Sequence, residues 1–207
     1  AVTLRQYRNY ANLAESYSAI PSNFLAITHG VSAVGKSHVA MRLVEALGAV
    51  RLRSDVERKR LFGEQKDADL GKLSAGIYTQ DASAATYQRL HQLAEAALHA
   101  GLPVVIDATY LKQAQRDAAS QVAEACGAPF LILECSAPDE VIASWLEQRK
   151  AAGSDPSDAT MDVVHAQQAS REALTDDELL HSKRVDTHES ASLDTLIARI
   201  RQRLTGL

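Results

Sequence analysis

A short turn bracketed by glycines, lying between a strand pattern and a helix pattern, constrains this chain most. Residues 24–40 read FLAITHGVSAVGKSHVA, and the turn at residues 30–37 fits GxxxxGK[ST]. The apolar run before the turn predicts a buried strand, and Val39, Leu43 and Leu47 after it recur at helical spacing. The sequence therefore predicts a strand, a tight loop and a helix in direct succession, which is the start of a βαβ unit.

The turn at residues 30–37 has the chemistry of a phosphate-binding loop. Glycine lets the backbone curl so that successive N–H groups face a phosphate at the N-terminus of the next helix, where partial positive charge favours an anion. Lys36 is predicted to reach the β- and γ-phosphates, and Ser37 Oγ to bind Mg²⁺, which prefers oxygen donors. The residues predicted to hold the nucleotide are Gly30, Val31, Ser32, Ala33, Val34, Gly35, Lys36, Ser37 and His38. The alternative is a glycine-rich strand-to-helix turn that contains Lys-Ser by chance.

Four further short apolar runs follow the first one, and helical patterns separate them. They cover residues 49–52, 104–106, 129–133 and the weaker 184–186. Such alternation predicts right-handed βαβ crossovers and a parallel sheet with helices on both faces. Ligands bind such sheets beyond the carboxyl ends of the strands, so we expect functional side chains just after each run.

The helical patterns define which further residues we expect in the core. Glycine and proline end two of these patterns, at Gly101 and Pro103 and at Gly127 and Pro129. The residues expected on buried helix faces are Leu90, Leu93 and Ala97, then Ala114, Ala118 and Val122, and finally Leu193, Leu196, Ile197, Ile200 and Leu204. Residues 63–79 match no pattern and stay unassigned.

An aspartate, Asp107, directly follows the run at 104–106. A carboxylate after a buried strand is typical of a Walker B aspartate, which holds the Mg²⁺ of a bound nucleotide through water. We predict Asp107 and Ser37 as the magnesium ligands. An aspartate in this position is also typical of a helix N-cap or a turn, and the sequence leaves that alternative open.

The second apolar run is followed by an acidic and a basic residue one helical turn apart, Asp55 and Arg58. Residues at i and i+3 lie on the same face of a helix, so the two side chains can act together. The Asp55 carboxylate is predicted to accept or orient the proton of an acceptor hydroxyl, and the Arg58 guanidinium to bind an anionic part of the acceptor. The alternative is that Asp55 caps the helix and that solvated arginines follow it.

Two further arginines are predicted to stabilise the charge that develops on the transferred phosphate. Arg149 ends a helix pattern and opens the polar stretch 150–160, which contains a glycine and a proline and resembles a lid. A lid that closes on ATP excludes water and completes the site. Arg116, nine residues after Asp107, is the second candidate. Each arginine is also consistent with a solvated surface residue.

Length and composition indicate one globular domain without an extended nucleic-acid surface. The chain has 207 residues, of which 46% are hydrophobic and 23% charged, and its net charge is −4. A pI near 6.0 gives no global basic field for a polynucleotide. Two cysteines, Cys126 and Cys135, are too few for a disulfide framework and are expected as reduced core residues. No apolar run approaches the roughly 20 residues of a membrane span, and no signal-peptide core is visible, so we expect a cytoplasmic protein without a membrane partner.

The first 21 residues precede the phosphate loop and are predicted to form a helix of their own. A proline, Pro21, ends the pattern. Its apolar positions at helical spacing are Leu4, Tyr7, Ala11, Ala14 and Tyr17. We expect residues 1–21 to be a linker from an upstream domain and residues 22–207 to form a P-loop kinase-like domain.

Four segments together resemble the zeta-toxin, gluconate-kinase and polynucleotide-kinase branch of the P-loop kinases. These segments read THGVSAVGKS, LRSDVERKRL, VVIDATYLKQAQR and EQRKAAGSDPSDAT, and the resemblance covers residues 24–204. It is strongest to the predicted ATP-binding kinase domains that are fused behind an aminoglycoside-phosphotransferase-like domain. The resemblance implies an α/β fold of the P-loop NTPase type, with three α/β/α layers, a parallel five-stranded sheet in the order 2-3-1-4-5 and a small helical lid.

The same resemblance implies roles for three of the candidate residues. In that family the aspartate of a D-x-x-R pair activates the acceptor hydroxyl, which falls on Asp55 with Arg58, and a lid arginine acts on the phosphates, which falls on Arg149. The leading helix would be the tail of a partner domain. Val34 departs from the small residue that many relatives have there, and residues 63–79 carry no acceptor motif that the resemblance assigns.

The predicted function is that of an ATP-dependent phosphotransferase, a kinase that moves the γ-phosphate to a hydroxyl of an unidentified small-molecule acceptor with ATP and Mg²⁺ as cofactors. A polynucleotide 5′-hydroxyl kinase is one alternative, although the overall acidity favours a small molecule. The local basic cluster that permits this alternative is Arg51, Arg53, Arg58, Lys59 and Arg60. A non-catalytic ATP-binding module that regulates a fused partner domain is the other alternative, and fold class alone does not decide between them.

Overall fold

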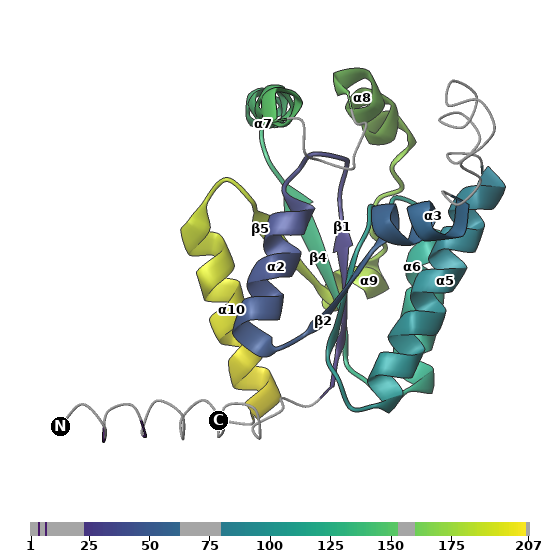
Figure 1. Cartoon of the computed structure of the whole chain (residues 1–207), viewed down its shortest axis with the longest axis vertical. Helices are drawn as coiled ribbons and strands as arrows, with labels where there is room; N and C mark the ends of the chain where they lie inside the picture. The colour runs from purple at the N-terminus through teal and green to yellow at the C-terminus, as the bar shows by residue number, and fades with distance from the viewer. Residues whose placement is uncertain (1–3, 5–6, 8–22, 63–79, 153–159, 206–207) are drawn as a thin grey trace.

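A computed structural model describes Leu4, Tyr7 and residues 23–62, 80–152 and 160–205, in which a single sheet lies between helices (Figure 1). The strands are β1 (Leu25–His29), β2 (Val50–Arg53), β3 (Val104–Asp107), β4 (Phe130–Ser136) and β5 (Ser182–Asp186). The helices are α2 (Lys36–Leu47), α3 (Ser54–Phe62), α5 (Gln80–His99), α6 (Gln113–Ala125), α7 (Asp139–Ala152), α8 (Met161–Ser170), α9 (Asp176–Leu180) and α10 (Ser190–Thr205).

The five strands are parallel, and their order across the sheet is β2-β3-β1-β4-β5. The predicted fold class, including this strand order, is confirmed. β1 is the central strand, where Ala26 pairs with Val105 of β3 on one side and with Leu131 of β4 on the other. Parallel strands covered on both faces have no exposed side, and every residue of β1 is accordingly buried. The loops at the carboxyl ends of the central strands therefore meet at one edge, where the predicted site residues lie.

Helices cover both faces of the sheet and divide its core into two clusters. α2 and α10 pack on one face, and α5 and α6 pack on the other (Figure 1). Because successive strand residues point to opposite faces, Ala26 belongs to the cluster under α2 and α10 while Leu25 and Ile27 belong to the cluster under α5 and α6. Each fully buried Leu or Ile contributes roughly 1.5–3 kcal/mol, so both clusters stabilise the frame that holds the site.

The buried faces of the helices agree with the sequence for α2 and α10 but differ in α6. Val39, Leu43 and Leu47 of α2 are buried as predicted, and so are the described members of the predicted α10 stripe, namely Leu193, Leu196, Ile197 and Ile200. In α6 the fully buried residues are Arg116, Ala119 and Ala123, while of the predicted residues Ala114 is exposed and Ala118 and Val122 are half-buried. The reason is that a buried ion pair, described below, turns Arg116 inward. In α5, Leu90 is buried, whereas the predicted Leu93 and Ala97 are only half-buried.

The two cysteines are free thiols in different settings. Cys135, on β4, is buried, and burial raises the pKa of its thiol to about 12. Cys126 is half-buried at the end of α6. Of the two predicted core residues, Cys135 is buried and Cys126 packs against the core cluster under α5 and α6.

Helices α7 and α8 lie beyond the carboxyl ends of the strands, at the top of Figure 1. Val164 of α8 is fully buried, and Met161 packs against the core cluster under α2 and α10. The stretch predicted as a lid, residues 150–160, runs from the end of α7 to the start of α8. Residues 153–159 between them, residues 63–79, and the predicted leading helix apart from Leu4 and Tyr7 lie outside the described residues. Across the described part of the chain, no helix has both the length and the apolar character needed to cross a membrane.

Candidate active site

The loop between β1 and α2 is curled by three residues with positive φ. These are Gly30 at 149°, Ala33 at 61° and Gly35 at 85°. A Cβ atom at Gly30 would lie 2.8 Å from the Cys135 carbonyl oxygen, and a Cβ atom at Gly35 would lie 2.8 Å from Thr187 Cβ. Both positions therefore require glycine for space as well as for conformation. The pattern GxxxxGK[ST] thus produces the expected tight loop at the N-terminus of α2.

Lys36 lies back across this loop. Its side chain is buried, and Nζ donates a hydrogen bond of 2.5 Å to the carbonyl oxygen of Val31. The first turn of α2 contains no acidic residue, so the partial positive charge at the N-terminus of the helix adds to the charge of Lys36. The positive potential needed to hold a polyphosphate is present at residues 30–37. His38 is exposed in the same turn, and its N–H donates to the Gly35 carbonyl.

The segment after β5 braces the loop through Thr187, a residue that the sequence analysis missed. Thr187 Oγ1 lies 2.8 Å from the Val34 carbonyl oxygen and 3.0 Å from the Ser136 carbonyl oxygen, so its hydroxyl proton is shared between the loop and the end of β4. The only sequence signal was its position directly after a predicted strand.

The two predicted magnesium ligands lie in contact. Ser37 Oγ donates to Asp107 Oδ2 at 2.8 Å, and the Asp107 side chain is buried. A hydroxyl and a carboxylate oxygen form the hard donor set that Mg²⁺ prefers, so these residues fit the ion. Arg51 also binds Asp107 Oδ2, through Nε at 3.1 Å and through Nη2, and Arg53 Nε lies 4.0 Å away. These cations offset the carboxylate charge.

The two arginines come from the neighbouring strand. In the register of β2 and β3, Arg53 pairs with Asp107, so alternate β2 residues point toward the same carboxylate. The sequence analysis assigned Arg51 and Arg53 only to a basic cluster. Their contact with Asp107 needed the strand order and the register, neither of which the sequence specifies directly.

Asp55 faces the phosphate loop across a small hollow. It lies in the first turn of α3, and Arg58 Nη1 is 3.6 Å from its Oδ1, which makes an ion pair longer than a hydrogen bond. The hollow holds about 70 Å³. It is lined by Ser32, Ala33, Lys36, Ser37, Arg53, Ser54, Asp55, Asp107, Ala108 and Thr109. The structure therefore brings the predicted acceptor carboxylate, the loop lysine and both predicted magnesium ligands to one place.

Buried aromatic residues support the acceptor side of this hollow. The Tyr87 hydroxyl of α5 lies 3.1 Å from Thr109 Oγ1 and accepts a hydrogen bond from the Tyr110 N–H. Tyr110 has a φ of 47°, and its ring meets the Tyr87 ring edge to face at 4.9 Å. Burial raises the pKa of both phenols, so both stay protonated. They hold the turn after β3, and with it Thr109, beside the hollow.

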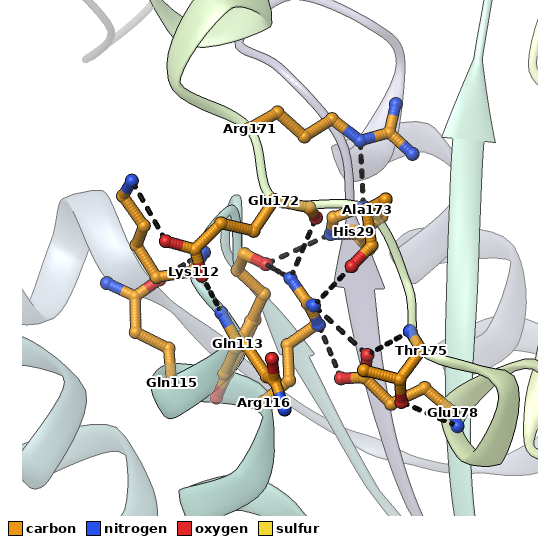
Figure 2. Close-up of polar contacts among 11 residues, drawn as sticks. His29, Lys112, Gln113, Gln115, Arg116, Arg171, Glu172, Ala173, Thr175 and Glu178 are labelled. Carbon is orange, nitrogen blue, oxygen red and sulfur yellow. Dashed lines mark hydrogen bonds and ion pairs between the residues drawn. The ribbon is translucent and has the colours of Figure 1, made fainter.

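Arg116 does not line the hollow. The prediction that it stabilises charge on the transferred phosphate is therefore corrected: its hydrogen bonds are made elsewhere. Figure 2 shows its guanidinium beside Glu172, Ala173 and Glu178. Nε and Nη2 donate to the two Glu178 carboxylate oxygens at 2.6 and 3.0 Å, Nη1 to the Tyr110 and Glu172 carbonyls at 3.3 Å, and Nη2 to the Ala173 carbonyl at 3.1 Å. All five N–H groups are used, so none is left for a phosphate.

The physical reason is that a buried charge needs a partner. The Arg116 side chain is fully buried, and Glu178 supplies the opposite charge from α9. Burial alone would raise the pKa of Glu178, but the hydrogen bonds from Arg116 and from the Thr175 N–H lower it below its usual value. Arg116 therefore fixes the segment that follows α8 against α6.

His29 and Arg171 join this segment to the phosphate loop. His29 Nδ1 lies 3.0 Å from the Tyr110 carbonyl oxygen, and Arg171 Nε donates to His29 Nε2 at 2.9 Å (Figure 2). Arg171 also pairs with Glu134 at 2.5 Å. Burial, followed by the charge of Arg171, lowers the pKa of His29 to about 4, so the imidazole is neutral with its proton on Nδ1. Arg171 has no sequence signal that would have identified it.

The remaining predicted site residue is Arg149. Its backbone belongs to α7, but its side chain lies outside what the structure describes, as do residues 153–159 of the predicted lid stretch. Its role therefore stays a prediction.

Comparisons with known proteins agree with this fold. A family described as "AAA domain" matches residues 25–174, which contain the phosphate loop, Asp55, Asp107 and Arg171. Uncharacterized proteins of Mycobacterium tuberculosis (strain ATCC 25618 / H37Rv) and Mycobacterium bovis (strain ATCC BAA-935 / AF2122/97) are each 30% identical over 150 residues. The match covers 70% of this chain and 29% of each relative, so the chain spans less than a third of their length.

Solved structures with the same fold include several kinases. A sugar kinase from Janibacter sp. HTCC2649 superposes with a TM-score of 0.62 at 21% identity, covering 89% of this chain and 95% of that one. A gluconokinase from Sinorhizobium meliloti 1021 gives 0.62 at 18% identity, with coverages of 90% and 97%. The Mycobacterium tuberculosis APS kinase CysC, in complex with AMPPNP and APS, gives 0.59 at 20% identity, with coverages of 87% and 96%. The chain therefore has a kinase-like P-loop fold.

Proposed function

Because this chain belongs to the family described as "AAA domain", with a P-loop and a kinase-like fold, we propose that it is an ATP-dependent kinase that phosphorylates a hydroxyl group of a small molecule. The observation that carries the proposal is the shared hollow. Lys36 and Ser37 of the phosphate loop line it together with Asp55 and Asp107. A phosphate held by the loop is thus presented to the residue suited to receive the acceptor's proton.

The residues of the hollow have complementary tasks in this reaction. The loop N–H groups and Lys36 bind the β- and γ-phosphates, and Ser37 with Asp107 would hold Mg²⁺, whose charge neutralises the phosphate oxygens. The acceptor oxygen attacks the γ-phosphorus as the bond to the β-phosphate oxygen breaks. The hydroxyl proton passes to Asp55, and ADP leaves with the bonding electrons. Arg58 and Arg53, beside Asp55, favour an acceptor or a transition state with negative charge.

The structurally similar kinases support phosphotransfer in general. The choice of a small acceptor rests on the net charge of the chain. The structural neighbours include a sugar kinase, a gluconokinase and an APS kinase in complex with AMPPNP and APS. The net charge of −4 disfavours a long polyanionic acceptor. A polynucleotide 5′-hydroxyl kinase is the second candidate, because Arg53 lines the hollow and Arg58 pairs with Asp55.

We further propose that residues 1–21 link this domain to an upstream one. The relatives from Mycobacterium are much longer than the matched segment, which covers 29% of their length. In such an arrangement the kinase-like domain either modifies a separate substrate or regulates its neighbour. Arg149, which begins the predicted lid stretch, is proposed to act on the phosphates when the lid closes.

A transfer assay with γ-labelled ATP tests the proposal. The full chain is incubated with Mg²⁺ and a panel of sugars, sugar acids, amino alcohols and 5′-hydroxyl oligonucleotides. We expect labelled product from a small hydroxyl compound, no product from Lys36→Ala, and a loss of about 100- to 10,000-fold in Asp55→Asn with ATP binding retained.

The control is Asp81→Asn, which removes a carboxylate from the first turn of α5, outside the hollow, and should leave transfer within twofold. Transfer at the wild-type rate by Asp55→Asn would show that the assigned base is wrong. Label on the oligonucleotides alone would favour the second candidate. Slow ATP hydrolysis without any labelled acceptor would favour a regulatory module.

A further inference from the structure

Helix α8 contacts the phosphate loop directly through Gln167. The Ser32 N–H donates to Gln167 Oε1 with an N···O distance of 2.6 Å. The contact joins residues 135 positions apart in the sequence. Ser32 also lines the hollow that contains Lys36 and Asp55. The amide oxygen of Gln167 on α8 thus accepts from a loop N–H that could also donate to an oxygen of a bound anion.

Gln167 is held in this position at both ends of its helix. Toward the N-terminus, Val164 is fully buried in the core cluster that also contains Val31 and Val34 of the loop. At the C-terminal end, Arg171 binds His29 and Glu134 at the ends of β1 and β4. The contact between Gln167 and Ser32 is therefore made by a seated helix.

The amide group of glutamine suits a position between an N–H group and a phosphate. Its oxygen accepts one hydrogen bond while its NH₂ group donates others from the same end of the side chain. With Oε1 on the Ser32 N–H, Nε2 of the same amide can donate to a phosphate bound beside Ser32. The phosphate that faces Asp55 is the one to be transferred, so the partner of Nε2 would be the γ-phosphate.

We propose that Gln167 is the contact through which α8 recognises the γ-phosphate, so that this helix distinguishes a triphosphate from a diphosphate. This inference rests on the proposed function, because it assumes a nucleotide in the loop. After transfer the γ-phosphate is absent, and α8 loses one of its contacts with the ligand. Release of the diphosphate product is thereby linked to the position of α8.

The test compares the affinities of the full chain for AMPPNP and ADP, each with Mg²⁺, by calorimetry. Gln167→Glu keeps an oxygen for the Ser32 N–H but replaces the donor by a negative charge. We expect Gln167→Glu to lower the affinity for AMPPNP by at least about tenfold, and Gln167→Ala by about three- to tenfold. The affinity for ADP should stay within twofold of wild type in both variants.

The neighbouring Gln168 provides a matched control. It is exposed on the same helix, and its Nε2 donates to Asp139 of α7 at 3.0 Å. Gln168→Ala should leave both affinities within twofold. Gln167 is half-buried, and thermal unfolding checks that each variant is folded; if Gln167→Glu does not fold, the ratio measured for Gln167→Ala decides.

Equal losses for AMPPNP and ADP would overturn the inference, because they would mean that Gln167 only fixes the loop. Unchanged affinity for AMPPNP in both Gln167 variants would also overturn it. A wild-type chain that binds neither nucleotide would instead refute the proposed function, and with it this inference. A wild-type chain that binds both, with no selective loss in the variants, would refute the inference alone.

Discussion

The phosphate loop and the segment 171–178 lie at the same edge of the sheet but present different backbone groups. The loop presents N–H donors, and the segment presents carbonyl acceptors. The loop at residues 30–37 provides N–H groups and the Lys36 ammonium, all suited to an anion. The segment after α8 provides the carbonyl oxygens of Glu172 and Ala173 and the Glu178 carboxylate, all suited to a cation. The chain supplies that cation itself, as Arg116. The phosphates that the loop is proposed to bind come from a ligand.

This difference separates stability from function. Because Arg116 already binds the carbonyl and carboxylate oxygens of the segment 171–178, it stabilises the folded protein without any ligand. The phosphate loop adds to the free energy of unfolding only when a ligand is bound, because a ligand stabilises the folded state that binds it. We therefore expect substitutions in the segment 171–178 and at Arg116 to change unfolding, and substitutions around the loop to change nucleotide affinity.

The largest expected effect is that of Arg116→Met. The substitution leaves the Glu178 carboxylate and three carbonyl oxygens without their common donor, and breaking such a buried pair costs about 3–5 kcal/mol. Urea-induced unfolding measures this loss. Arg42→Met removes an exposed pair with Asp194, whose side chains are 42% and 62% exposed, and should cost less than about 1 kcal/mol. Similar small losses in both variants would refute the structural role of Arg116.

An intermediate effect is expected from pH, through His29 at the boundary between the two regions. Burial and Arg171 lower its folded-state pKa to about 4, below the ordinary value of 6.5. Between pH 6.5 and pH 4, His29 is therefore mostly protonated in the unfolded chain and mostly neutral in the folded chain. Stability is fully present above pH 7 and falls as the pH drops from 6.5 toward 4, by about 2 kcal/mol at pH 5.

His29→Gln removes this titration, and unfolding free energies measured between pH 7.5 and 5 compare the two proteins. The wild type should lose more stability than the variant over this interval. His91, whose pKa burial also lowers, contributes to the slope in both proteins. Parallel slopes would mean that His29 is not protected from protonation.

The smallest effect on stability is expected from Thr187→Val, on the loop side. The variant removes the hydroxyl that joins the carbonyls of Val34 and Ser136, which contributes about 1 kcal/mol. We expect nucleotide affinity to fall by roughly five- to tenfold, because the loop is less firmly held. Thr195→Val, which removes a hydroxyl bound to the Ala191 carbonyl on the exposed face of α10, should leave affinity unchanged. A Thr187→Val variant with full affinity would show that this brace does not shape the loop.

The loop side was predictable from the sequence because its parts are local. Residues 30–37 are contiguous, and the motif needs only a strand before it and a helix after it, both of which hydrophobic spacing predicts. Asp55 and Asp107 follow from one further rule, that the carboxyl ends of parallel strands meet at one edge. The hollow brings these residues together as that rule requires.

The other region was not predictable because its contacts join distant parts of the chain. Arg116 and Glu178 are 62 positions apart, and Ser32 and Gln167 are 135 positions apart. An arginine in a helix pattern normally indicates a solvated face, and only the partner on α9 makes burial of Arg116 favourable. Arg51 likewise depends on the register between β2 and β3. The spacing of residues within one helix or strand does not predict contacts between residues that are far apart in the sequence.

The central claim is that residues 30–37, with Lys36, form a site for the phosphates of a nucleotide. Titration calorimetry of the full chain with ATP and Mg²⁺, alongside Lys36→Ala, tests it most directly. The account predicts saturable binding at one site, weakened at least about tenfold in Lys36→Ala. Absence of measurable binding by the wild-type chain to either ATP or GTP with Mg²⁺ would contradict it.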